Sequence, residues 1–241
     1  MKHKIASLTA TLKTTAAFGV KYAADFPATS TGGQQFALVS AAVPQTATLG
    51  AAQVSGGESA HAGALSKVAG RFHLHNDLHG IADAAHSLVL MGTAGLQGKF
   101  LMPRSGGDQS PLNTARAFQT DAAAFSTQFI SLGLPATFIT QLGTDITDFE
   151  AAIKAKGAGT GTRSGATGGL EDTANKAAIA LHVLKTIVPN TYKNDPAKLA
   201  EWATASHVEK HTPVARPATL AKKAAQAAAK NNPAPAAATT N

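Results

Sequence analysis

A histidine-rich stretch, RFHLHNDLHGIADAAHS, occupies residues 71–87 and holds the side chains best suited to chemistry. If the stretch is helical, His75, His79 and His86 project from one side, because each residue turns the helix by about 100°. His75 and His79 lie one turn apart and could bind one divalent metal ion, with Asp83 nearby as a carboxylate. His86 lies about 10 Å beyond His79 along the axis, so a tight site needs ligands from a second helix.

An apolar stripe runs beside these histidines and favours a simpler interpretation. The histidines then fill the polar flank of an ordinary helix, whose buried side carries Leu74, Leu78, Ile81, Ala85 and Leu88. We take this interpretation as the main one and expect no resident cofactor. The alternative is a divalent metal bound weakly by the histidine-rich helix 71–87, through His75, His79, Asp83 and His86.

Other catalytic arrangements are missing from the sequence. The chain has no cysteine, which excludes disulfides, thiolate metal sites and cysteine nucleophiles. Ser164 lies among glycines without the preceding strand that a serine nucleophile elbow needs. The surrounding stretch GAGTGTRSGATGG, residues 157–169, lacks the Gly-Lys-Ser/Thr ending of a phosphate-binding loop. We therefore expect a protein that is not an enzyme.

Positive charge is concentrated at the two ends of the chain. The net charge is +7, and residues 1–24 contain four lysines and no acidic residue. Residues 209–241 contain five basic residues and one acidic residue, whereas residues 25–208 are nearly neutral. Such basic ends attract polyanions such as nucleic acid, although they could also serve only to keep the chain soluble. The candidate contacts in the tail are Lys210, Arg216, Lys222, Lys223 and Lys230.

The spacing of apolar residues predicts an all-α fold. Apolar residues recur three and four positions apart in six segments, and no segment alternates like a strand. Consecutive helices joined by short turns pair in opposite directions, so we predict an antiparallel helical bundle of about five to seven helices in residues 1–208. Residues 209–241, rich in proline, alanine and lysine, are predicted to form a disordered basic C-terminal tail.

Proline and glycine predict interruptions in this bundle. Pro44 is expected to kink or end the helix that begins near Gly33. Gly63 and Gly70 leave open whether residues 57–91 form one helix or two. The composition of residues 157–169 predicts a flexible linker within the bundle.

Two aspartates are placed where helices are expected to start. Asp108 or Ser110 can cap a helix that has Pro111 in its first turn. Arg104 could pair with Asp108 or with a carbonyl at a helix end. Asp195 can cap a short helix that begins at the following proline. Trp202, the single tryptophan, is expected to anchor this short helix on the bundle.

Two stretches carry a resemblance to a known group of proteins. KFLMPRSGGDQSPLNTARAF, residues 99–118, and YKNDPAKLAEWATASHVEK, residues 192–210, resemble segments of an uncharacterised family of bacterial helical-bundle proteins. The resemblance covers most of residues 1–210 and implies a similar bundle with a similar tail. It implies no activity, and therefore no catalytic residue.

These features predict a non-enzymatic protein that works by association, with itself or with a partner, and that contacts polyanions through its basic ends. No apolar run approaches the roughly 20 residues needed to span a bilayer. The opening MKHKIASLTATLKTTAAFG is too polar for a secretory signal, so the expected location is the cytoplasm.

Overall fold

The computed structural model describes residues 3–103 and 106–208, and every regular element in these ranges is helical. The predicted all-α class is therefore confirmed. In chain order the elements are α1 (His3–Lys21), α2 (Thr31–Leu90), α3 (Gln109–Ala122), the 3-10 turn η1 (Ala123–Phe125), α4 (Ser126–Ser131), α5 (Phe138–Thr191) and α6 (Pro196–Ala205). Two of them dominate, because α2 has 60 residues and α5 has 54.

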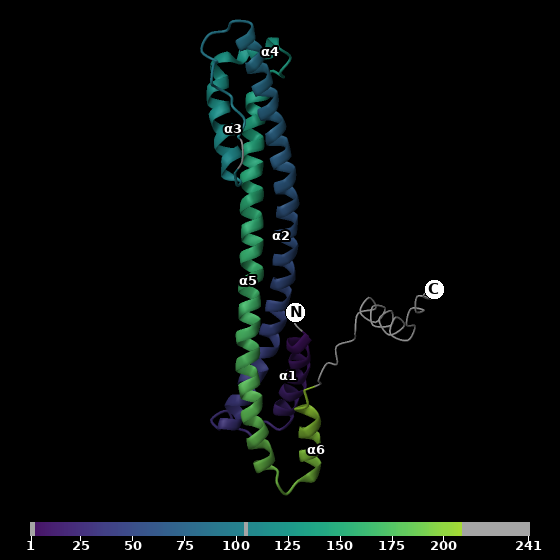
Figure 1. The fold of residues 1–241 in the computed structure, drawn as a ribbon. Coiled ribbons are helices and arrows are strands. Elements are labelled where there is room, and N and C mark those ends of the chain that lie inside the picture. The colour runs from purple at the N-terminus through teal and green to yellow at the C-terminus, as the bar shows by residue number, and fades with distance from the viewer. Residues whose placement is uncertain (1–2, 104–105, 209–241) are drawn as a thin grey trace, which may run out of the picture.

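The helices α2 and α5 lie side by side along the molecule, with α3 and α4 at one end and α1 and α6 at the other (Figure 1). Their contacts run in reverse order, so that positions rise along α2 as they fall along α5. Leu49 of α2 lies against Gly169 of α5, Gly56 against Gly159, and Gly70 against Phe149. One pair of long helices therefore joins the two ends of the molecule.

Each end of this helix pair has its own hydrophobic core. The first core joins the second half of α2 to α3, α4 and the start of α5, and includes Leu78, Phe118 and Phe129. The second joins α1, the start of α2, the end of α5 and α6, and includes Phe18 and Trp202. The shorter helices thus cover only the ends of the pair.

Between the two cores, α2 and α5 approach each other through small residues. A Cβ atom added to Gly63 would lie 2.5 Å from the backbone nitrogen of Lys156. A Cβ atom added to Gly159 would lie 2.4 Å from the backbone nitrogen of Ala60. Both distances are shorter than real Cβ atoms adopt, so these two positions require glycine for the backbones to touch.

The prediction of a flexible linker at residues 157–169 is wrong, because all of these residues are helical within α5. Glycine lowers helix propensity by about 1 kcal/mol per residue relative to alanine, which is why the composition suggested a linker. Packing offsets this cost: Gly159 and Ala166 are buried in α5. The segments before and after this stretch therefore belong to one helix, α5.

Pro44 neither ends α2 nor separates it from the histidine-rich segment. The lost hydrogen bond and the ring clash cost about 3 kcal/mol, but Phe36, Val39 and Thr46 on either side of the proline are buried. Packing therefore holds the helix together on both sides of Pro44. The same helix continues through residues 57–91 as far as Leu90, which answers the question of one helix or two.

The two predicted helix caps have different outcomes. Asp195 caps α6 as predicted, since its side chain accepts a hydrogen bond from the Lys198 nitrogen at 3.1 Å. Asp108 makes no capping hydrogen bond at the start of α3, contrary to the prediction. Its carboxylate instead pairs with Lys67 of α2 at 2.8 Å. Arg104, the predicted partner of Asp108, lies outside the described residues.

Within residues 3–103 and 106–208, no helix combines the length and the hydropathy that a bilayer crossing requires.

Candidate interaction surface

The side of α2 that points away from α5 carries an unusual set of exposed side chains. Leu65, Val68 and Phe72 are 60%, 68% and 63% exposed, although each would ordinarily be buried. Val54, which precedes these three residues in α2, and Leu90, which follows them, are 59% and 76% exposed. Scattered exposed leucines are common, but these five residues recur on one side of a single helix.

Helical spacing places these residues on one continuous face. Eleven exposed residues of α2, each three or four positions from the next, point within about 60° of the direction of Phe72. Gly56, Gly63 and Gly70, which contact α5, lie on the opposite side of the helix. We call this set the outward face; its members are Val54, Glu58, His61, Leu65, Val68, Phe72, His75, His79, Asp83, His86 and Leu90.

The four residues predicted as metal ligands all belong to the outward face. His75, His79, Asp83 and His86 are exposed, and the predicted buried stripe beside them is indeed buried. The rings of His75 and His79 lie 4.5 Å apart between centroids, as expected for residues one turn apart. The described part of the chain contains no group of three or more histidine, cysteine, aspartate or glutamate side chains placed to hold a metal ion.

The apolar part of the outward face was not predicted from the sequence. The sequence does contain the helical spacing of this part, because Val54, Leu65, Val68 and Phe72 follow one another at intervals of eleven, three and four residues. The intervening glycines suggested an interrupted helix, which hid this spacing. A residue's side of the helix can be assigned only when the helix is known to be continuous.

A partly buried pair of carboxyl groups, Asp77 of α2 and Asp145 of α5, links the two long helices. Oδ2 of Asp77 is buried and finds no hydrogen-bond partner within the described residues. Burial, followed by the hydrogen bond and the negative charge of Asp145 on α5, raises the pKa of Asp77 to about 7. A protonated Asp77 can donate a hydrogen bond to the Asp145 carboxylate. Asp77 also lines a cavity of about 290 Å³ with Phe138 and Gln141.

Replacing Asp77 by asparagine is expected to stabilise the protein increasingly as the pH rises. The folded-state pKa is raised, so the native state of the unaltered chain loses stability between about pH 4 and about pH 7. Because water reaches this half-buried pair, we expect a gain of only about 1–2 kcal/mol at about pH 8 and almost none at about pH 4. Urea unfolding across this range measures the gain. Asp148→Asn, at an exposed position on α5, is the control, and equal profiles for both variants would contradict the assignment.

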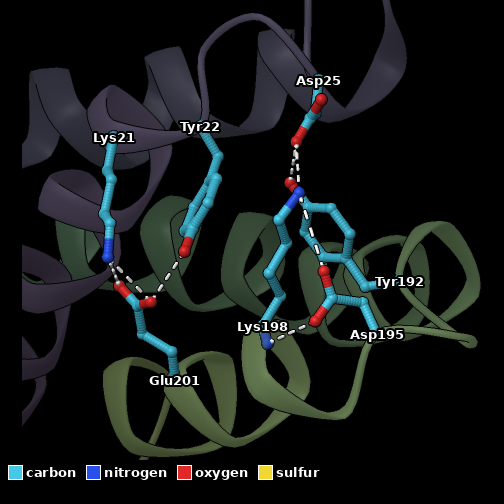
Figure 2. A network of polar contacts seen from close by, with 7 residues as sticks. All are labelled: Lys21, Tyr22, Asp25, Tyr192, Asp195, Lys198 and Glu201. Atoms are coloured by element: carbon cyan, nitrogen blue, oxygen red, sulfur yellow. Dashed lines mark hydrogen bonds and ion pairs between the residues drawn. The ribbon is translucent and has the colours of Figure 1, made fainter.

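A cluster of hydrogen bonds and ion pairs connects the elements at the end of the molecule that contains α6 (Figure 2). Glu201 accepts hydrogen bonds from Lys21 at 2.8 Å and from the Tyr22 hydroxyl at 2.7 Å. The Tyr192 hydroxyl donates to Asp25 at 2.6 Å, and Lys198 lies 3.2 Å from the same carboxylate.

Each charged group in this cluster has a compensating partner. The hydrogen bond from Tyr192, followed by that from Lys198, lowers the pKa of Asp25. The hydrogen bonds from Lys21 and Tyr22 lower the pKa of Glu201. Burial, and then the hydrogen bond to Asp25, raises the pKa of Tyr192. The cluster thus joins α1, the end of α5 and α6, and its groups are occupied with one another.

The predicted polyanion contacts cannot be placed, because Lys210, Arg216, Lys222, Lys223 and Lys230 lie outside the described residues. The site residues that the structure does bring onto one surface are therefore those of the outward face.

Comparison with family models, with curated proteins and with solved structures finds no match for this chain.

Proposed function

We propose that this chain works by association rather than by catalysis, and that the outward face of α2 is the surface through which it associates. The observation that carries the proposal is the exposure of Val54, Leu65, Val68, Phe72 and Leu90 on one side of one helix. These residues extend over about 54 Å of helix at 1.5 Å per residue. Leu65, Val68 and Phe72 are consecutive members of this face, and adjoining exposed apolar side chains of this kind are typical of an interaction site.

The architecture supports a structural role for the long helices. An antiparallel pairing of α2 with α5, as expected from the sequence, agrees with the reverse order of their contacts. The shorter helices cover the ends of the pair, so the middle of α2 keeps one side open. A long helix with an apolar stripe is a common means of binding a second helix.

The proposal is tested by comparing two exposed positions on different helices. Phe72→Ser is expected to abolish complexes that chemical crosslinking captures in cells expressing the unaltered chain. Ile179→Ser is the matched control, because Ile179 is 66% exposed on α5, outside the outward face. Loss of the same complexes in both variants, or in neither, would contradict the proposed role of this surface.

Contact with polyanions through the basic ends is a separate part of the proposal. It rests on the four lysines of residues 1–24 and on the five basic residues of residues 209–241. The full chain is expected to retard a short DNA duplex at low salt, and the retardation should decline steeply as salt is added. A chain lacking residues 209–241 should retard the duplex less. Equal retardation by the two chains, or none by either, would contradict this part.

Metal binding is the alternative function, and the observation in its favour is the proximity of His75 to His79. Two imidazoles one turn apart can hold one divalent ion, with water completing the coordination shell. Elemental analysis of protein purified without a histidine tag tests this alternative. A stoichiometric metal that is lost in His79→Ala would favour it over association, whereas a sample that cannot be loaded with zinc would remove it.

A further inference from the structure

We propose that the partner of the outward face is a second copy of the same chain, docked with the two α2 helices antiparallel and with a twofold axis at Phe72. This inference rests on the proposed function and specifies its partner and its register. It depends on whether the outward face of one copy is complementary to the same face of a second copy that runs in the opposite direction.

A twofold axis at Phe72 pairs every member of the outward face with another member. Residues whose numbers sum to 144 lie at the same level of the two helices, so Phe72 meets Phe72 of the other copy. The remaining levels join Val54 with Leu90, Glu58 with His86, His61 with Asp83 and Leu65 with His79, and Val68 lies beside His75. An isologous interface requires this kind of self-complementarity.

The charges on the face are complementary in this register. Both acidic residues of the face, Glu58 and Asp83, lie next to histidines of the other copy. Imidazole can donate a hydrogen bond to a carboxylate whether or not it carries a second proton. The twofold axis generates each pair twice, which gives four imidazole–carboxylate pairs in the dimer.

A parallel arrangement would lack this complementarity. Each residue would then face its own copy, so that Glu58 would meet Glu58 and Asp83 would meet Asp83. Adjacent like charges oppose association, and they are one means by which proteins select one orientation over another. The outward face therefore favours the antiparallel dimer.

The apolar residues are distributed to suit the same register. Phe72 lies at the centre, where interface residues are most fully removed from water and contribute most to binding. Val54 and Leu90 meet at both ends of the contact, so apolar pairs close the interface beyond the charged pairs.

The area of the face is sufficient for a specific dimer. A strip about 54 Å long and about 10 Å wide gives on the order of 500 Å² per copy, or about 1,000 Å² in total. This total lies at the lower limit for a stable protein interface, so we expect a dimer of moderate affinity.

The approach to the face is open among the described residues. The two basic residues that flank it, Lys67 and Arg71, are drawn to Asp108 at 2.8 Å and 3.6 Å. Their side chains therefore point toward the loop before α3 and do not cover the outward face.

The absence of cysteine from the chain allows a direct test of the register. Full-length Phe72→Cys is expected to form a covalent dimer with a short bis-maleimide reagent. Val54→Cys and Leu90→Cys should each remain uncrosslinked alone but should crosslink to each other when mixed. Ile179→Cys, similarly exposed on α5, is the control and should not form a covalent dimer with the reagent.

Sedimentation velocity gives the second measurement. The unaltered chain should form a dimer as its concentration rises to about 100 μM, where even a micromolar complex is nearly saturated. Glu58→Lys should weaken the dimer at least tenfold, and the double variant Glu58→Lys with His86→Glu should restore it. A monomer throughout, or crosslinking of Val54→Cys to itself, would overturn the proposal.

Failure of this proposal can be told apart from failure of the proposed function. A monomeric chain that still loses its captured complexes in Phe72→Ser has a different partner on the same face, and only the second copy is then wrong. A monomeric chain whose complexes are unaffected by Phe72→Ser contradicts both.

Discussion

Gly159→Ala is expected to destabilise the protein by about 2 kcal/mol or more, whereas Gly161→Ala, two residues away, should stabilise it by about 1 kcal/mol. A Cβ atom at Gly159 would lie 2.4 Å from the Ala60 nitrogen and 2.9 Å from the Gly56 oxygen. Both are backbone atoms, so α2 and α5 would have to move apart. At Gly161 nothing lies within 4 Å of an added Cβ atom, and alanine gains only helix propensity.

Urea unfolding followed by circular dichroism measures both changes. The pair of variants is its own control, because the two substitutions are chemically identical and lie in the same glycine-rich segment. Two small effects of the same sign would indicate that this segment does not pack against α2, and they would contradict the close approach of the two backbones.

Trp202→Ala is expected to cost about 3–5 kcal/mol, the range found for large aromatic side chains removed from a core. Trp202 is only 4% exposed, and its ring centroid lies 5.1 Å from that of Phe18 and 6.1 Å from that of Phe36. The ten residues of α6 are too few to be helical alone, so the helix depends on this packing. We expect α6 to separate from α1 in the variant.

Two measurements test whether Trp202 packs in the core. Loss of stability in Trp202→Ala is read from urea unfolding, with the exposed Ile179→Ala as the control. In the unaltered chain, the emission of this single tryptophan reports on the packing of α6. A variant within about 1 kcal/mol of the unaltered chain, typical of a surface substitution, would contradict the assignment of Trp202 to the core.

The sequence predicted those helices whose apolar stripes face a core. Phe138, Leu142, Ile146 and Phe149, which recur three and four positions apart, are buried, and so are Leu74 and Leu78 of the stripe predicted beside the histidines. In these segments large side chains recur every three or four residues, and burial of that stripe determines the structure. The cap of α6 could also be predicted, because it depends on neighbours in the sequence.

The middle of the molecule could not be predicted from composition, for a physical reason. Helix propensity penalises Gly159 and Gly63, yet the close backbone contact that they permit becomes apparent only when α2 and α5 lie together. The helix does not end at Pro44 for the same reason, since burial of residues on either side outweighs a local penalty.

The outward face and the carboxyl pair depend on this tertiary information. Without a continuous α2, nothing relates Val54 to Phe72 or assigns either to a side of the helix. Without the pairing of α2 with α5, nothing brings Asp77 of one to Asp145 of the other. The histidines, by contrast, could be placed on one helix face from their spacing alone.

The existence of the outward face depends on α5 being one helix that supports α2 along its whole length. Hydrogen exchange of the backbone amides of residues 157–169 tests this claim most directly. Amides held in helical hydrogen bonds against α2 should exchange much more slowly than those of an unstructured peptide, and at rates similar to those of residues 145–156. Exchange of residues 157–169 at the rate of an unfolded chain would contradict the claim.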